Sequence, residues 1–261
     1  MIVAITILVA AAALSFCAAG SGQNGSVAGA RDPFIGAVET MKHSVAPVAC
    51  VGVNGGESKL LARRGTAFFV STAGEFITAA HVLQDMQKID PACPVTAVIL
   101  PRNRTWDPSA LNEDVEWFAF KIGTCLIDRD LDVAKCRTTH DLSSQTLDFK
   151  IVPVQFHWDV PPDAAPVAFT GFPMNARDPM TLRANVAAYR PVWRNEKLVP
   201  EVLLDRGAWP GSSGSPIFLS DGRVIGILIA ARTEEGTAMT SLRPVSAVRD
   251  LLTAAYGSGK K

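Results

Sequence analysis

Residues 209–217 read Trp-Pro-Gly-Ser-Ser-Gly-Ser-Pro-Ile and are the most informative stretch of the 261-residue chain. Glycine and proline on both sides of the serines let the backbone fold tightly and aim amide groups inward. A serine held in such a turn is a candidate nucleophile for acyl transfer, because nearby backbone N–H groups can stabilise a negative oxygen. That chemistry also requires an imidazole to take the hydroxyl proton and a carboxylate to orient the imidazole.

Two earlier stretches supply these partners. Residues 76–83, Phe-Ile-Thr-Ala-Ala-His-Val-Leu, place His81 just past a β-branched strand end, where we expect an exposed tight turn. Residues 130–134, Asp-Leu-Asp-Val-Ala, place a carboxylate where a turn leads into an apolar strand. The three stretches therefore occur in the order His, Asp, Ser along the chain.

The rest of the sequence predicts mostly short strands. Apolar segments alternate with turn residues, and Asp221-Gly222 between two such segments is a hairpin signal. Residues 147–154 and 198–204 are among the predicted strands. Strands of this length and spacing predict a sandwich or barrels. Only the segment 244–256 is clearly helical, with one apolar face: Val245, Val248, Leu251, Leu252 and Ala255.

Together these motifs resemble those of trypsin-like serine proteases. Thr78-Ala79-Ala80-His81 is similar to their histidine motif, Asp132-Val133-Ala134 to the step around their aspartate, and residues 211–216 to their Gly-x-Ser-Gly-Gly-Pro motif. Residues 65–70 and 170–173 resemble segments of bacterial trypsin-like and HtrA-type peptidases. The resemblance covers about residues 45 to 255, and the order His, Asp, Ser is that of the chymotrypsin fold.

The resemblance implies an all-β fold of two antiparallel six-stranded β-barrels with a C-terminal helix. The first barrel is expected at residues 33–145, and the second barrel with the terminal helix at 146–261. The active site is expected in the crevice between the barrels. Only a helix and a short tail follow the second barrel, so we expect no PDZ domain.

The resemblance also implies the role of each residue. Ser213 is the expected nucleophile, His81 the general base and Asp132 the group that orients the imidazole. The amides of Gly211 and Ser213 are the expected oxyanion hole. The implied activity is that of a serine endopeptidase, which cleaves polypeptides through an acyl-enzyme and needs neither cofactor nor metal.

Each assignment has a rival in the sequence. Ser212 and Ser215 are neighbours of Ser213, but only Ser213 has glycine two residues before it and directly after it. Asp130 lacks the following Val-Ala and is interpreted as a turn residue. Three further histidines lack the motif: His43, His140 and His157. The alternative function is a membrane-anchored, non-catalytic binding or scaffold protein on the same fold, which leaves the intact triad unexplained.

Substrate selection is less clearly encoded. Ser212 stands where animal digestive and clotting enzymes have Asp, so activation by insertion of a freed N-terminus is not expected. Apolar and mostly small residues are expected to line the specificity pocket: Ala208, Trp209, Ile229, Ala230 and Ala231. A substrate strand would pair along residues 229–231. Since neither wall offers a carboxylate, we predict cleavage after small or medium apolar residues and not after Lys or Arg.

Four cysteines follow the N-terminal region, and an even number in an exported chain predicts disulfides. Cys125 and Cys136 flank a predicted hairpin that turns at residues 128–130, so their sulfurs can face each other. Cys50 and Cys93 are then the second pair. Three pairings are open in principle, and four buried free thiols are the alternative. The cysteines lack Cys-x-x-Cys spacing, so no metal is expected.

The N-terminal region carries the export signal. Residues 2–19 form an almost unbroken apolar run that includes Cys17, and residues 20–32 read as a linker. The run predicts either a cleaved signal peptide or a retained membrane anchor; no Lys or Arg precedes it. Either alternative takes the chain out of the cytoplasm, and we expect it to be periplasmic or secreted, with membrane anchoring as the second form.

Composition excludes several other classes of protein. The chain has 25 Lys and Arg against 25 Asp and Glu, so its net charge is zero. Nucleic-acid binders and polybasic membrane-binding proteins usually carry a basic excess, and neither is expected here. Apolar residues make up 48% and charged residues 19%, which is typical of a globular protein. We expect a monomer.

Overall fold

A computed structural model describes residues 31–54, 57–89, 93–101, 117–145, 147, 150–234 and 237–256. The predicted signal peptide or anchor at residues 1–19, and residues 20–30 of the predicted linker, lie outside this part. Within the described residues, every helix is too short or too polar to cross a membrane.

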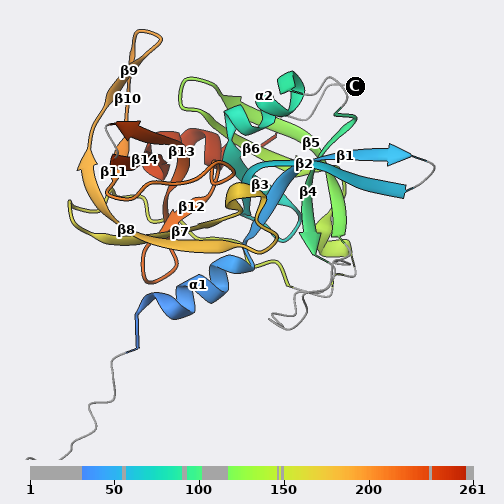
Figure 1. The fold of residues 1–261 in the computed structure, drawn as a ribbon, viewed down its shortest axis with the longest axis horizontal. Helices are drawn as coiled ribbons and strands as arrows, with labels where there is room; N and C mark the ends of the chain where they lie inside the picture. The colour runs from blue at the N-terminus through green and yellow to red at the C-terminus, as the bar shows by residue number, and fades with distance from the viewer. Residues whose placement is uncertain are drawn as a thin grey trace, which may run out of the picture. The chain divides into compact units, whose positions relative to one another are not determined.

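Six strands of the first half close into an antiparallel barrel (Figure 1). In order around the barrel they are β1 (Val45–Asn54), β2 (Glu57–Phe69), β3 (Glu75–Ala79), β6 (Val133–Thr138), β5 (Trp117–Asp128) and β4 (Val95–Pro101). The strands alternate apolar residues toward the inside. Phe69 and Phe76 lie opposite each other on β2 and β3, are fully buried, and pack edge to face with 6.3 Å between ring centroids.

Six strands of the second half close into another antiparallel barrel. In order they are β11 (Val202–Leu204), β14 (Thr237–Pro244), β13 (Val224–Glu234), β12 (Pro216–Phe218), β7 (Pro166–Gly171) and β8 (Met180–Tyr189). A separate hairpin, β9 (Val192–Arg194) and β10 (Lys197–Val199), projects from the barrel in Figure 1. The expected all-β fold of two six-stranded barrels is therefore confirmed.

Helical segments are short. The α-helices are α1 (Phe34–Lys42), α2 (Ala80–Ile89) and α3 (Arg249–Thr253). The 3₁₀ turns are η1 (Leu142–Ser144), η2 (Pro173–Asn175) and η3 (Val245–Val248). The predicted C-terminal helix is present as η3 followed by α3, and it ends at Thr253 instead of Tyr256.

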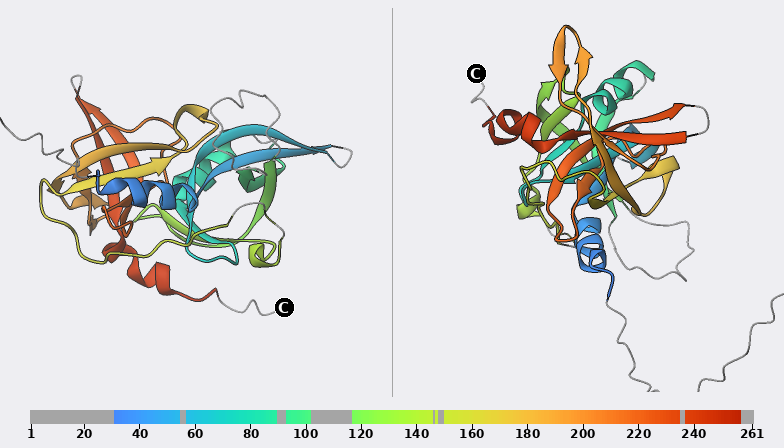
Figure 2. Two further views of the ribbon diagram at one scale, coloured as in Figure 1. Left: turned by 90° about the horizontal axis from the view of Figure 1, so that it is seen from below. Right: turned by 90° about the vertical axis from the view of Figure 1, so that its left-hand side faces the viewer.

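One cluster of buried side chains joins the two barrels. Phe68 and Ile77 from the first barrel pack with Phe218 from the second, and Phe34 of α1 belongs to the same cluster. Helix α1 lies along the second barrel beside β7, as the left view of Figure 2 shows. Burying a side chain of this size contributes about 1.5–3 kcal/mol, so this shared core fixes the barrels against each other.

Two predicted strands differ from the structure. The segment 147–154 was expected to be one strand, but residues 150–154 belong to none. The amides of Val152 and Val154 instead donate to the carbonyls of His43 and Phe69, because this segment connects the barrels. The strand predicted at 198–204 is two strands, β10 and β11, because Pro200 interrupts the ladder.

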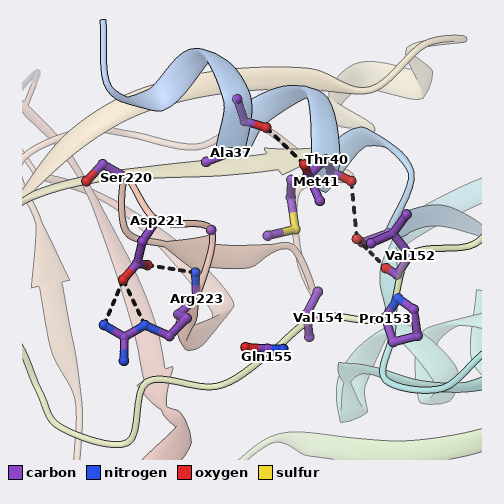
Figure 3. Close-up of a pocket in the computed structure, with 13 residues that line it drawn as sticks. Ala37, Thr40, Met41, Val152, Pro153, Val154, Gln155, Ser220, Asp221 and Arg223 are labelled. Carbon is purple, nitrogen blue, oxygen red and sulfur yellow. Dashed lines mark hydrogen bonds and ion pairs between the residues drawn. The ribbon is translucent and has the colours of Figure 1, made fainter.

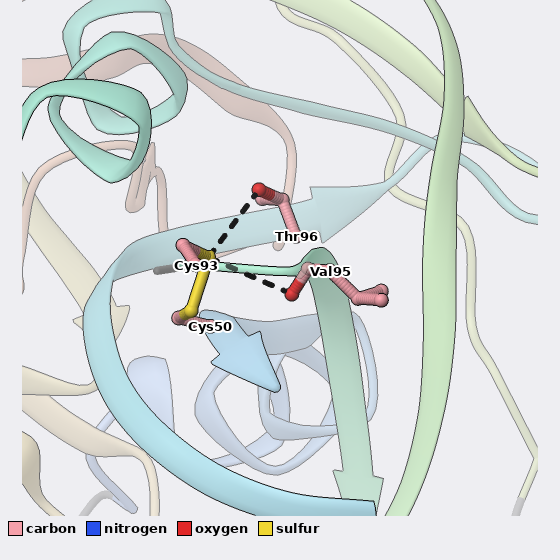
Figure 4. Close-up of a disulfide and its surroundings, with 4 residues drawn as sticks. All are labelled: Cys50, Cys93, Val95 and Thr96. Carbon is pink, nitrogen blue, oxygen red and sulfur yellow. Dashed lines mark hydrogen bonds between the residues drawn. A yellow bond between two sulfur atoms is a disulfide. The ribbon is translucent and has the colours of Figure 1, made fainter. Parts of the chain in front are cut away.

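Both predicted disulfides are present. Cys125 and Cys136 lie directly opposite each other on β5 and β6, and their sulfurs are bonded. Cys50 on β1 is bonded to Cys93, which precedes β4 (Figure 4). The alternative of four free thiols is therefore wrong. Two disulfides are typical of an oxidising compartment outside the cytoplasm.

Candidate active site

His81 is the second residue of α2, which begins directly after β3. The sequence predicted a turn at this point, and the helix was missed. Ala80 and Val82 on either side of His81 are 1% exposed and pack into the core of the first barrel. The His81 side chain is 33% exposed. Burial of its two neighbours therefore holds the backbone while the imidazole stays accessible.

Asp132 holds the start of this helix from the loop between β5 and β6. Its Oδ2 lies 2.8 Å from His81 Nδ1, and its Oδ1 accepts a hydrogen bond from the His81 amide at 2.9 Å. Its backbone carbonyl accepts a hydrogen bond from the Ala80 amide at 3.1 Å. Both carboxylate oxygens thus contact His81, which fixes the orientation of the imidazole ring.

The backbone of Asp132 is left-handed, with φ of 58°. Aspartate tolerates this region better than most residues, but the conformation is still costly without glycine. The preceding turn is stabilised locally, since Asp128 Oδ1 accepts a hydrogen bond from the Leu131 amide at 2.9 Å. The left-handed residue lets the carboxylate and the carbonyl of Asp132 face the same helix end.

Ser213 lies in the loop between β11 and β12 of the second barrel, and two glycines set the path of this loop. Gly211 has φ of 94° and Gly214 has φ of 87°. A Cβ atom on Gly211 would overlap the carbonyl oxygen of Phe172, and one on Gly214 would overlap that of Thr66. Both positions therefore require glycine for conformation and for space.

Thr66 of β2 attaches this loop to the first barrel. Its amide donates to the Ser213 carbonyl at 2.8 Å, and its hydroxyl donates to the Gly211 carbonyl at 3.0 Å. The same hydroxyl accepts a hydrogen bond from the Phe172 amide at 3.0 Å. The sequence predicted only a strand here, because nothing local marks a threonine that bonds to residues more than 100 positions away.

Two amides of the Ser213 loop take no part in the backbone hydrogen bonds that hold the loop. The amides of Ser212, Gly214 and Ser215 donate to backbone carbonyls at 2.7–3.0 Å. Within the described part of the chain, the amides of Gly211 and Ser213 have no such acceptor. These are the two amides predicted to form the oxyanion hole, and both residues are half-buried.

The histidine and serine segments meet where the barrels meet. A Cβ on Gly214 would lie 3.0 Å from the amide nitrogen of Ala79, two residues before His81. A Cβ on Gly65 would meet both the Val82 side chain and, at 3.0 Å, the Ser213 carbonyl. The structure therefore brings the His81, Asp132 and Ser213 segments together between the barrels.

The predicted pocket walls lie beside this loop. Ile229 is buried, Ala230 is half-buried and Ala231 is exposed on β13. Ala208 is half-buried and Trp209 is 40% exposed. These five residues come from the two segments that flank the Ser213 loop in the second barrel.

Asp205, the carboxylate that precedes Ala208 and Trp209 in the sequence, pairs with Asn185. Asp205 accepts hydrogen bonds from the amide and the side chain of Asn185, at 2.7 and 2.8 Å. These bonds hold the pKa of Asp205 below its usual value. Both carboxylate oxygens of Asp205 are therefore engaged by Asn185.

The alternative candidates for the nucleophile and the carboxylate differ from Ser213 and Asp132 in burial and in contacts. Ser212 and Ser215 are 2% and 0% exposed, whereas Ser213 is partly accessible. Asp130 Oδ1 accepts from Asn195 and its Oδ2 pairs with Lys197, at the tip of the β9–β10 hairpin. The sequence indicates a turn residue at Asp130 and does not predict these contacts.

A pocket of about 360 Å³ lies between α1, the connection between the barrels and the β12–β13 turn (Figure 3). Met41, Val154 and Gly222 contribute to its lining, together with Asp221 and Arg223, which pair with each other at 2.7 Å. The predicted catalytic and substrate-binding residues are not among those that line it. This pocket is therefore separate from the candidate active site.

The protein has two six-stranded barrels. One carries a His–Asp pair, and the other carries a serine in a loop shaped by two glycines. This arrangement defines the chymotrypsin-like class of fold. A sequence model of the trypsin-like peptidase domain matches residues 65–227, a range that contains His81, Asp132 and Ser213. Because the match covers more than half of the chain, the protein belongs to the trypsin-like peptidase domain family. A comparison with curated protein sequences gave no match.

Solved structures resemble this fold at low sequence identity. The active form of the Rv3671c protease from M. tuberculosis is 16% identical, with a TM-score of 0.59 over 85% of this chain and 86% of that one. Deg5 is 15% identical, with a TM-score of 0.58 over 83% and 90%. The MamO protease domain from Magnetospirillum magneticum is 18% identical, with a TM-score of 0.58 over 83% and 100%. At these identities the likeness shows the fold alone.

Proposed function

We propose that this protein is an exported serine endopeptidase that hydrolyses polypeptides through an acyl-enzyme. Its peptidase unit comprises a first barrel at residues 33–145 and a second at 146–261. The observation that carries the proposal is the double contact of Asp132 with His81, at 2.8 and 2.9 Å, beside the loop that presents Ser213. The His81–Asp132 contact supplies the base and the orienting carboxylate of a triad, and Ser213 is the proposed third member.

In the proposed reaction, Ser213 Oγ attacks the scissile carbonyl carbon while His81 Nε2 takes its proton. Asp132 keeps the proton of the neutral imidazole on Nδ1 and stabilises the imidazolium that forms. The imidazolium then donates its proton to the leaving amine, the C–N bond breaks and the acyl-enzyme remains. Water activated by the same imidazole hydrolyses the ester and restores Ser213.

The free amides of the serine loop support this chemistry. In the tetrahedral intermediate the former carbonyl oxygen is negative, and the Gly211 and Ser213 amides would each donate a hydrogen bond to it. Removing one such donor typically costs about 10²–10³-fold in kcat. Because the loop is held by Thr66 and by internal bonds, these donors are fixed before the substrate binds.

One edge of β13 supports an extended substrate. β13 pairs with β14 along one edge at Leu228 and from Ala230 to Glu234, with a bulge at Ile229. Among the described strands, none pairs with its other edge at residues 229–231. An added substrate strand would satisfy these backbone groups, as in other cases of strand addition.

The proposed pocket favours small or medium apolar side chains. Ala230 and Ala231 offer no charge, and Asp205 is bound to Asn185. A Lys or Arg side chain in this pocket would be buried without a carboxylate partner, which is unfavourable. Cleavage after apolar residues is therefore expected.

Digestion of a proteome-derived peptide library tests both the activity and the specificity. We expect wild type to cleave after small and medium apolar residues. The variant Ser213→Ala should fall to background, about 10⁶-fold lower. Ser220→Ala, which changes an exposed serine outside the candidate site, should match wild type. Equal cleavage by Ser213→Ala contradicts the mechanism, and dominant cleavage after Lys or Arg contradicts the specificity.

A further inference from the structure

The loop that carries Asp132 is held from the second barrel at two points. Asp130 binds Asn195 at 2.9 Å and Lys197 at 2.7 Å, so the tip of the β9–β10 hairpin rests on it. The next residue, Leu131, is held through its carbonyl oxygen, which accepts a hydrogen bond from Arg243 Nε at 2.9 Å. The position of Asp132 therefore depends on these contacts as well as on β5 and β6, the strands that its loop connects.

Arg243 is a buried cation on β14, with 0% of its surface exposed. A second nitrogen of its guanidinium, Nη1, donates to the carbonyl of Pro200, just after β10. Arg243 thus joins the base of the β9–β10 hairpin to the loop that carries Asp132. The tip of the same hairpin contacts this loop at Asp130.

Keeping this charge buried is costly. Burial, and to a lesser degree the nearby Arg194, lower the pKa of Arg243 to about 10, while Glu201 and Asp132 act in the opposite direction. The guanidinium therefore stays charged at neutral pH. The cost of burying a charge offsets much of what its hydrogen bonds contribute to stability, which favours a role for Arg243 in placing the groups that it contacts.

Peptide geometry links the Leu131 carbonyl to the conformation of Asp132. The Leu131 carbonyl and the Asp132 amide belong to one planar unit. Rotation of that unit about the N–Cα bond of Asp132 is the angle φ, which here has the unfavourable value of 58°. A donor fixed on the Leu131 oxygen therefore opposes relaxation of Asp132 toward negative φ.

We propose that Arg243 is a positioning residue that holds Asp132 in its left-handed conformation and thereby keeps its carboxylate on His81. The proposal rests on the proposed peptidase function for its kinetic effect. Its structural effect, the integrity of the His81–Asp132 contact, is measurable without any turnover.

Arg243→Met removes both hydrogen bonds, and Lys135→Met is the matched control. Lys135 is also a buried cation, 6% exposed, and its Nζ donates to two backbone carbonyls, those of Leu252 and Ala254. Both variants should lose thermal stability. Only Arg243→Met should lower kcat, by about 10- to 100-fold with KM nearly unchanged, because misplaced catalytic groups cost this much. Arg243→Lys should retain an intermediate kcat, since an ammonium lacks the planar fork of arginine.

The second readout is the low-field NMR signal of the His81 Nδ1 proton, recorded with Ser213→Ala as the background. We expect the signal in that background and with Lys135→Met, and its loss or displacement with Arg243→Met. If Arg243→Met does not fold, Arg243→Lys decides by the same two readouts. A folded Arg243 variant with wild-type kcat and an unchanged signal overturns the proposal. Absence of peptidase activity in wild type would overturn the proposed function, while the signal still tests the role of Arg243.

Discussion

The hydroxyl of Thr66 donates a hydrogen bond to the Gly211 carbonyl at 3.0 Å, although the two residues are 145 positions apart. Through this bond a strand of the first barrel holds the loop of the second barrel that presents Ser213. Together with the bond from the Thr66 amide to the Ser213 carbonyl, it fixes the barrel that carries His81 and Asp132 to the loop that carries Ser213.

Thr66→Val should impair the site and destabilise the protein. The valine methyl replaces the hydroxyl, so the Gly211 carbonyl and the Phe172 amide lose their partner. A buried group without a partner costs about 1–3 kcal/mol, and this loss should appear in urea unfolding. Thr66→Ser keeps the hydroxyl and should recover most of the loss. Equal stability of Thr66→Val and wild type would show that the hydroxyl does not hold the loop.

Gly214→Ala should be much more harmful than Gly222→Ala. Both glycines have positive φ, 87° and 83°, so each alanine carries a conformational cost of about 1–2 kcal/mol. At Gly222 the nearest atom to a new Cβ is 3.8 Å away, but at Gly214 the Cβ would overlap the Thr66 carbonyl. Overpacking adds about 1–3 kcal/mol to Gly214→Ala. Unfolding free energies measured in urea should show this difference, and equal losses would contradict the close approach at Gly214.

Removing the Cys50–Cys93 disulfide should cost more stability than removing Cys125–Cys136. The first closes a loop with a sequence separation of 43, and the second one of 11. The chain-entropy relation then gives losses of about 4 and about 3 kcal/mol for the two double alanine variants. Urea unfolding of each variant, with the other disulfide intact, measures both. The reverse order would show that native packing around the short hairpin outweighs loop entropy.

Lys197→Met should raise the pKa of Asp130. The hydrogen bond from Lys197, and then that from Asn195, hold the pKa of this carboxyl below 3.8. A carboxyl whose pKa is lowered by folding stabilises the folded state at pH values above its pKa in the unfolded chain. This contribution is lost as the pH falls through its pKa in the folded protein. NMR titration of the Asp130 carboxyl carbon should show the pKa return toward 3.8 in Lys197→Met, with a smaller rise in Asn195→Ala. An unchanged value would mean that the hairpin tip does not contact Asp130 in solution.

Local features of the sequence predicted much of this architecture. The glycines at 211 and 214 and the short alternating strands act within a few residues, so the serine loop and an all-β sandwich or barrel fold were predictable from them, and the two six-stranded barrels followed from the resemblance to trypsin-like proteases. The pairing of Cys125 with Cys136 followed from the symmetry of one hairpin. The motif around His81 predicted a role for this histidine. It did not predict the start of α2, since Thr-Ala-Ala-His was interpreted as a turn.

Contacts between distant segments were not predictable. Thr66 and Arg243 look like ordinary strand residues, and their partners are 145 and 112 positions away. Residues 147–154 look like a strand because apolar residues recur in them. Their amides nevertheless donate to carbonyls that only the packed barrels bring near, such as that of Phe69. A single sequence carries no sign of which distant carbonyl an amide will meet.

The most direct test of the central claim is covalent labelling with a fluorophosphonate, followed by mass spectrometry of the intact protein and its peptides. The proposed mechanism predicts one adduct per chain, located on Ser213, absent from Ser213→Ala and unchanged in Ser220→Ala. His81→Ala should label far more slowly, since no base would take the hydroxyl proton. Labelling that survives Ser213→Ala, or no labelling of folded wild type, would contradict the assignment of Ser213 as the nucleophile.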